Sequence, residues 1–307
     1  MFAARLNHYA LALLRRMPRP ALRRIRGFPP LDCRGESPVL AVLTTPRDWL
    51  EALWCAYGWR RFFPDALAVR FFLDGEVDSR HTADVAHLFP GARIEQPRPL
   101  DASLGSPALE AIFRHHRFGR KLHALLALNQ RSPILYSDFD VLCFREPEEL
   151  LASVKQDGPP RFMREQSYEH TDPWMAARAA AAGIALPAHF NAGMLYLPRG
   201  ALSLALAREL VTGWTPAVDH LLTEQTLMAA LVGASDGHEL PPERYVTSWD
   251  GMTVWQRDHT EISDVVMRHY CGVVRHRFYE QGLPWLEKRI HTASRSATTP
   301  APAAEST

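Results

Sequence analysis

The sequence is poor in cysteine, carries almost no net charge and lacks a long apolar run. Its four cysteines, Cys33, Cys55, Cys143 and Cys271, have no CxxC spacing, which argues against a zinc knuckle, a redox pair or a secreted disulfide framework. A formal charge of +1 makes no extended positive field, so we do not expect nucleic acid as a partner. No stretch reaches the roughly 18 to 20 apolar residues that a membrane-spanning helix needs. These absences favour a cytoplasmic protein whose partners bind at a local site.

Charge is nevertheless uneven along the chain, because residues 1–30 carry seven arginines and no acidic residue. Phe2, Leu6, Tyr9 and Leu13 recur at helical spacing in this segment. A short amphipathic helix of this kind can lie on the anionic inner surface of a membrane. A helix packed on the domain, or a loosely ordered basic arm, is the alternative. The apolar run is too short, and too closely followed by arginines, for a secretory signal peptide.

Strand-like and helix-like patterns alternate through the rest of the chain. Apolar runs predict strands at 38–45, 66–74, 92–96, 134–144, 161–165, 190–197 and 264–272, and helical spacing predicts helices at 47–62, 83–89, 108–129, 146–154, 201–213 and 223–233. This alternation implies an α/β fold with a mostly parallel central sheet and helices on both faces. We expect a catalytic domain over 38–290, a basic arm over 1–37 and a disordered tail over 291–307. Residues 166–188 are expected to form a surface excursion over a site.

Two aspartates stand at the end of one predicted strand, in the segment "ILYSDFDVLCF" at 134–144. In an extended chain a spacing of two turns the carboxylates of Asp138 and Asp140 to one side and Phe139 to the other. Buried carboxylates need a partner or a metal, and ligands of α/β sheets bind at the carboxyl ends of strands. The pair therefore indicates a site for a hard cation such as Mg²⁺ or Mn²⁺. A solvated turn is the alternative.

Four segments, "ILYSDFDVL", "FNAGMLYL", "TEQTLMAAL" and "RHYCGVVRH", follow in an order that resembles nucleotide-sugar glycosyltransferases of the GT-A fold. The resemblance is to the glycogenin and bacterial lipopolysaccharide galactosyltransferase type, over about residues 38–290. It implies a GT-A-like fold and a metal-dependent glycosyltransferase. Such an enzyme moves a sugar from a nucleoside diphosphate sugar, here a UDP-sugar, to a glycan, lipid or protein acceptor, with retention of anomeric configuration.

The resemblance also assigns a metal site. In that family the two aspartates and a late histidine bind Mn²⁺ or Mg²⁺, which bridges the donor diphosphate, and the matching residues are Asp138, Asp140 and His269. A hydrogen-bonded core histidine is the alternative for His269. In the same late motif Gly272 and Arg275 would face the donor. Relatives often have lysine where this chain has Arg275, and arginine can grip phosphate with two parallel hydrogen bonds.

Further donor-binding residues are implied by position. Lys121, 17 residues before Asp138 (138 − 121), resembles a basic residue that contacts the phosphate or the sugar of the donor, with Arg120 and Arg117 as alternatives. Asn191 and Ala192 match residues that contact the transferred sugar. Thr44, at the end of the first predicted strand, would seat the nucleotide base.

Two further features near these residues bear on the site. Gly193 would let the backbone approach a neighbour closely. Relatives have Asp-Gln where this chain has Glu224 and Gln225, the expected catalytic pair. The extra methylene moves the carboxylate by over an ångström, a displacement that matters in a catalytic site.

Two other functions stay open from the sequence. A sugar-phosphate nucleotidyltransferase has the same fold, although such enzymes usually carry a glycine-rich basic loop after the first strand and "TTPRDWLEALW" contains none. A degenerate domain that binds a sugar or a partner without turnover is the third possibility. Such a domain could lack a metal site.

Overall fold

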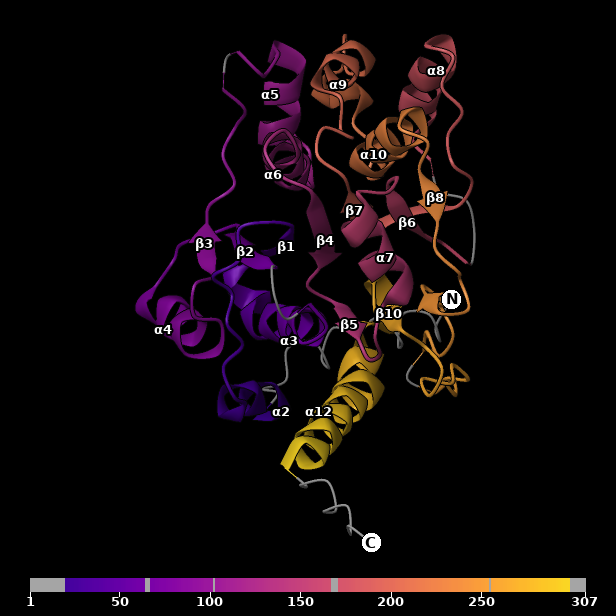
Figure 1. Ribbon diagram of the computed structural model, residues 1–307. Helices are drawn as coiled ribbons and strands as arrows, with labels where there is room; N and C mark the ends of the chain where they lie inside the picture. The colour runs from indigo at the N-terminus through magenta and orange to yellow at the C-terminus, as the bar shows by residue number, and fades with distance from the viewer. Residues whose placement is uncertain (1–19, 64–66, 102, 167–170, 254, 299–307) are drawn as a thin grey trace, which may run out of the picture.

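A seven-stranded sheet forms the centre of the computed structural model, which describes residues 20–63, 67–101, 103–166, 171–253 and 255–298 (Figure 1). The predicted membrane-contacting helix lies almost wholly before residue 20, outside the described residues. The strand order is β3-β2-β1-β4-β7-β6-β8. Every pairing is parallel except those of β7 with β4 and β6. The strands are β1 Val39–Thr44, β2 Ala68–Leu73, β3 Arg93–Glu95, β4 Ile134–Asp138, β6 Arg161–Arg164, β7 Phe190–Leu197 and β8 His238–Glu239. The predicted α/β class is confirmed.

A three-stranded sheet, in the order β5-β10-β9, lies beyond the carboxyl end of β4. Its strands are β5 Val141–Cys143, β9 Tyr245–Val246 and β10 Met267–His269. Only Phe139 and Asp140 separate β4 from β5, so the chain passes directly from one sheet to the other. β5 and β10 pair antiparallel, with His269 opposite Val141. This pairing brings a late segment of the chain to the end of β4.

Helices cover both faces of the central sheet, and the alternation of side chains along β1 shows why. Leu40 and Val42 enter one apolar core, and Val39 and Ala41 enter the other. The first core is covered by α2 Pro20–Arg23, α3 Trp49–Arg60, α4 Ser79–Leu88, α7 Glu148–Gln156 and α12 Leu283–Thr298. The second is covered by α5 Pro107–His115, α6 Gly119–Asn129, α8 Pro173–Ala181, α9 Leu204–Leu210 and α10 Thr223–Ala234. In Figure 1 the second set lies at the top.

Short helical turns complete the described chain: η1 Arg24–Gly27, η2 Pro46–Asp48, η3 Pro216–Val218, η4 Gly272–Val274, α11 Arg275–Arg277 and the π-helical turn η5 Phe278–Gly282. None of the described helices combines the length and the apolar character needed to cross a bilayer.

The single helix predicted over 108–129 is in fact two helices, α5 and α6. Gly119, the first residue of α6, packs directly on the α5 backbone, because a Cβ there would overlap the carbonyl of Ile112. Only glycine permits this close approach. The chain can therefore turn between α5 and α6, although the helical spacing of apolar residues continues through the turn. Two short helices thus replace one long one.

The ends of the expected catalytic domain are packed more extensively than the sequence suggests. Leu22, Ile25 and Phe28, from the predicted basic arm, are buried in the first core, and Trp54 Nε1 donates to the carbonyl of Leu22 at 3.0 Å. At the other end α12 continues to Thr298, past the predicted boundary at 290. The predicted surface excursion at 166–188 contains α8, whose Met175 is buried in the second core.

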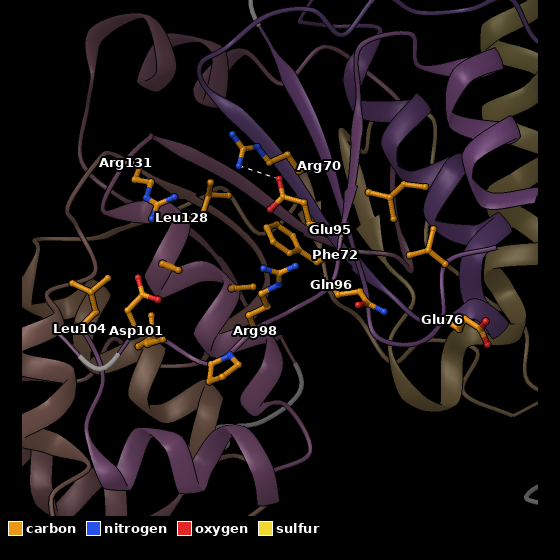
Figure 2. A pocket seen from close by; sticks show the side chains of 16 residues that line it. Arg70, Phe72, Glu76, Glu95, Gln96, Arg98, Asp101, Leu104, Leu128 and Arg131 are labelled. Atoms are coloured by element: carbon orange, nitrogen blue, oxygen red, sulfur yellow. Dashed lines mark hydrogen bonds and ion pairs between the residues drawn. The ribbon is translucent and has the colours of Figure 1, made fainter. Parts of the chain in front are cut away.

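One part of the sheet has less helical cover. Next to β2, β3 and α6, residues within 96–101, together with Leu104, border a cavity of about 880 Å³ (Figure 2). Side chains of the sheet, of α6 and of these residues line it.

Candidate active site

The two aspartates lie at the carboxyl end of β4, where β1 and β4 run parallel. Asp138 is the last residue of β4, and the Asp140 carboxylate follows in the turn to β5, 3% exposed. Tyr136 is two residues before Asp138 on the same face of the strand, and its hydroxyl donates to Asp138 Oδ1. The alternation of side chains along β4 therefore places the Tyr136 hydroxyl beside the Asp138 carboxylate.

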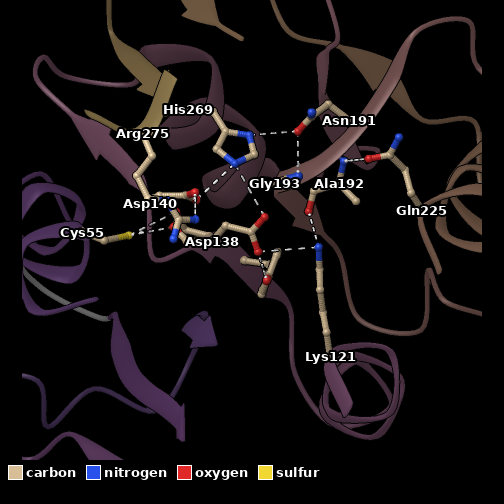
Figure 3. Close-up of polar contacts among 12 residues, drawn as sticks. Cys55, Lys121, Asp138, Asp140, Asn191, Ala192, Gly193, Gln225, His269 and Arg275 are labelled. Carbon is tan, nitrogen blue, oxygen red and sulfur yellow. Dashed lines mark hydrogen bonds and ion pairs between the residues drawn. The ribbon is translucent and has the colours of Figure 1, made fainter. Parts of the chain in front are cut away.

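His269 completes a cluster with the two aspartates (Figure 3). Its Nε2 lies 3.2 Å from Asp140 Oδ1 and 3.7 Å from Asp138 Oδ2. One potential ligand atom from each of the three residues lies within 4.8 Å of the other two. The pairing of β5 with β10 fixes this arrangement, since the Tyr270 amide also donates to the carbonyl of Asp140 at 2.9 Å.

The imidazole is held from its other side by β7. Ser137 pairs with Met194, which places Gly193 beside Asp138. Asn191 Oδ1 accepts from the Gly193 amide at 2.8 Å and lies 3.2 Å from His269 Nδ1. A contact at Nδ1 leaves Nε2 directed at the carboxylates, as in histidines oriented for metal binding. Glycine is required at 193, because a Cβ there would lie 2.2 Å from His269 Cε1.

Two positive groups act on the Asp140 carboxylate. Arg275 Nη2 donates to Asp140 Oδ2, its guanidinium carbon lies 4.5 Å from the centroid of the Phe139 ring, and its Nη1 lies 3.8 Å from Asp48. Burial raises the pKa of Asp140, but the charges of Arg275 and His269 outweigh burial and hold that pKa well below its usual range. Burial lowers the pKa of His269, while Asp140 chiefly raises it, and the net shift is upward.

Lys121 is buried on α6 and faces the cluster from the side away from Arg275 (Figure 3). Its Nζ donates to the Ala192 carbonyl at 2.9 Å and lies 3.6 Å from Asp138 Oδ1 and 3.4 Å from Glu224 Oε1. Burial lowers the pKa of Lys121, but Asp138 and Glu224 raise it more. The Lys121 ammonium therefore stays charged and balances two carboxylates.

The expected catalytic pair opens α10. Glu224 is 3% exposed, and burial raises its pKa although Lys121 opposes the shift. Apart from the Lys121 ammonium at 3.4 Å, its Oε1 has no hydrogen-bond donor among the described residues. Gln225 Oε1 lies 3.5 Å from the Ala192 amide. Thr223, at the start of the helix, donates to Asp172 Oδ2 at 2.6 Å, so α8 and α10 are tied together beside the site.

Nine of the residues expected in the site form one connected set of contacts: Lys121, Asp138, Asp140, Asn191, Ala192, Glu224, Gln225, His269 and Arg275. Thr44 is outside this network; it is 1% exposed and its hydroxyl donates to the Thr45 carbonyl at 3.3 Å. Gly272 follows the histidine in the turn η4, with a positive φ of 53° and Trp249 closely packed against it.

A second cavity, of about 800 Å³, adjoins the network through Arg275 and Asp48. Pro46 and Arg47, directly after Thr44 and Thr45, also line it. The cavity therefore lies at the carboxyl end of β1. Arg275 lines this cavity and also contacts the carboxylate cluster through Asp140.

Sequence reasoning missed Glu165, Tyr136 and Asp48. Glu165 is buried just after β6, where its carboxylate accepts from Asn191 Nδ2 at 3.3 Å and from Trp249 Nε1 at 2.9 Å. It could have been found by the rule that pointed to Asp138, because it is an acid at the end of an apolar strand. Tyr136 could have been found from its spacing of two with Asp138.

Comparison with known proteins supports a fold class. Neither a protein-family model nor a curated protein sequence matches this chain. Solved structures do match, and among them are glycosyltransferases of the GT-A fold. The chain therefore has this fold, and the predicted fold is confirmed.

Two of these structures are of the galactosyltransferase LgtC. In complex with donor and acceptor sugar analogues, LgtC superposes with a TM-score of 0.54 at 15% sequence identity, over 87% of this chain and 98% of LgtC. An active-site mutant of LgtC gives a TM-score of 0.52 at 16% identity, over 86% of this chain and 98% of the mutant. At this level of identity the likeness establishes the fold.

Proposed function

We propose that the protein is a metal-dependent glycosyltransferase that moves a sugar from a nucleoside diphosphate sugar, of the UDP-sugar type, to a glycan, lipid or protein acceptor. The observation that carries the proposal is the cluster of Asp138, Asp140 and His269 at the carboxyl end of β4 in a GT-A fold. Ligands of open α/β sheets bind at this end of the strands.

The three side chains fit a divalent cation. Their potential ligand atoms lie within 4.8 Å of one another, and Asn191 already orients the imidazole. Two carboxylates suit Mg²⁺ or Mn²⁺, whereas an imidazole ligand favours a transition metal. The donor set therefore favours Mn²⁺ over Mg²⁺. When bound, the cation would neutralise negative charge on the departing nucleoside diphosphate.

Residues around the cluster would bind the two ends of the donor. Arg275 lies between the carboxylates and the 800 Å³ cavity, where a guanidinium can bind a phosphate group. The cavity, at the end of β1, has room for the nucleoside. Lys121 places a second positive charge beside Asp138, on the side away from Arg275.

The transferred sugar would lie toward Asn191 and Ala192, with Glu224 and Gln225 at the start of α10. These positions surround Lys121 and carry amide and carboxylate groups that can bind sugar hydroxyls. Glu224 Oε1 is paired with the Lys121 ammonium at 3.4 Å and has no other hydrogen-bond donor in the described structure, so a sugar hydroxyl could donate to it as well. We propose that transfer proceeds with retention, as the resemblance implies.

The test is release of nucleoside diphosphate from a panel of UDP-glucose, UDP-galactose, UDP-N-acetylglucosamine and GDP-mannose, with Mn²⁺ or with EDTA. We expect one donor to be hydrolysed with Mn²⁺ and none with EDTA. Asp140→Asn should abolish release, while the control Asp264→Asn, at a side chain 91% exposed, should not. Activity that survives in EDTA or in Asp140→Asn would contradict the proposal, as would failure of every donor to bind.

A further inference from the structure

The 880 Å³ cavity beside β2, β3 and α6 is separate from the candidate active site. None of its lining residues belongs to the network around Asp138 and His269. Its apolar wall includes Phe72 and Leu128, both of the second core, and Leu104, which packs against that core. Its volume is within the range of about 300 to 1,000 Å³ typical of small-molecule sites.

Residue size and charge explain why the space is open. α6 presents Ala124 and Ala127 to the cavity, so the helix fills little of the volume above β2. On β2 the face between Ala68 and Phe72 belongs to an apolar core, yet Arg70 occupies the intervening position on that same face. An arginine at such a position destabilises the fold unless its guanidinium group is paired or hydrogen-bonded.

Three arginines surround the cavity: Arg70, Arg98 and Arg131 (Figure 2). Arg70 Nη1 lies 3.2 Å from Glu95 Oε1. Neither Arg98 nor Arg131 makes a side-chain hydrogen bond or ion pair with another residue in the described part of the chain. Two guanidinium groups with free donors therefore flank an apolar wall.

Carboxylates are also present in the wall. Asp101 and Glu95 lie on the same side of the cavity as the arginines in Figure 2, whereas Glu76 lies apart from them. Such acids disfavour a ligand that is only a multiply charged anion, and the arginines disfavour one that is only apolar. The wall instead matches a molecule with both an anionic group and hydroxyl donors.

We propose that this cavity binds a small sugar phosphate ester. Arg98 and Arg131 would bind the phosphate, since the guanidinium fork matches its oxygens. Asp101 and Glu95 would accept hydrogen bonds from sugar hydroxyls, and the apolar C–H face of the ring would lie on the apolar wall near Phe72. The proposal does not depend on the transferase activity.

Isothermal titration calorimetry with glucose 6-phosphate and glucose 1-phosphate tests this site. We expect saturable binding of at least one ester, and weaker binding of glucose or inorganic phosphate alone. Arg98→Gln/Arg131→Gln should weaken binding of the ester by about tenfold or more, because charge-assisted hydrogen bonds are lost. Both side chains are exposed, so the variant should fold.

Two controls locate the binding. Arg199→Gln/Arg257→Gln removes the same charge from exposed positions elsewhere and should leave the affinity unchanged. Asp140→Asn, in the candidate active site, should also leave it unchanged. The proposal is overturned if neither ester binds the wild-type protein, if the Arg98→Gln/Arg131→Gln variant binds as tightly as wild type, or if Asp140→Asn abolishes binding.

Discussion

Replacement of Gly193 by alanine tests how the candidate metal site is built. The added methyl group would lie 2.2 Å from Cε1 and 2.3 Å from Nδ1 of His269, and 2.9 Å from Asn191 Oδ1. Ordinary contacts of a Cβ begin at about 3.4 Å, so the imidazole must retreat by about 1.2 Å (3.4 − 2.2). Because His269 is buried and already hydrogen-bonded, it cannot move that far and keep its place.

The size of the imidazole displacement determines how much Mn²⁺ affinity the variant should lose. Metal–ligand distances tolerate only about 0.2 Å of change, so a displacement several times larger removes the imidazole as a ligand. We expect Mn²⁺ affinity to fall by roughly 10- to 100-fold or more, the range known for disturbed support of a metal ligand. Overpacking should also lower the free energy of unfolding by about 1 to 3 kcal/mol.

Calorimetric titration with Mn²⁺ and urea unfolding measure the two effects. Gly27→Ala is the matched control, because a Cβ at Gly27 meets no atom within 4 Å. That variant should bind Mn²⁺ as wild type does and be equally stable or slightly more stable. The reasoning is refuted if Gly193→Ala retains wild-type Mn²⁺ affinity and stability.

Two further predictions concern the charges of the network. Lys121→Met should lower the free energy of unfolding by about 3 to 5 kcal/mol, because it leaves the buried Glu224 carboxylate without a cation and removes one positive neighbour of the half-buried Asp138. Urea unfolding should show partial recovery in Lys121→Met/Glu224→Gln, and purely additive losses would contradict the pairing. The pKa of Asp140 is lower in the folded than in the unfolded chain, so the carboxylate stabilises the fold above its unfolded pKa of about 3.9. That contribution is constant well above the unfolded pKa and is lost only as pH falls below it toward the lower folded pKa, so the stabilities of wild type and Asp140→Asn should differ by a constant amount from pH 7 to about pH 5 and draw together progressively below about pH 4; a difference that stays constant in acid would contradict the Arg275 contact.

Much of the fold could be predicted from local patterns. The alternation of strand-like and helix-like patterns predicted the α/β sheet with helices on both faces, and the two acids at the end of β4 pointed to the candidate site. The break between α5 and α6 could not be predicted, because the apolar spacing continues through it and only the packing of Gly119 on Ile112 requires the turn.

Those parts of the candidate site that depend on contacts between segments far apart in the sequence were harder to predict. His269 reaches the aspartates because β10 pairs with β5, and no local pattern encodes that pairing; only the family resemblance pointed to it. Arg275 was expected at the phosphates, but its contact with Asp140 spans 135 residues of sequence. The sequence indicated a close approach at Gly193, and the structure shows that the approaching group is the imidazole.

The central claim is that one divalent ion is held jointly by Asp138, Asp140 and His269. Titration of the metal-free protein with Mn²⁺, followed by calorimetry, measures it directly. We predict one ion per chain, with binding abolished in Asp138→Asn/Asp140→Asn and strongly weakened in His269→Gln. No Mn²⁺ uptake by the wild-type chain, or unchanged uptake by these variants, would contradict the claim.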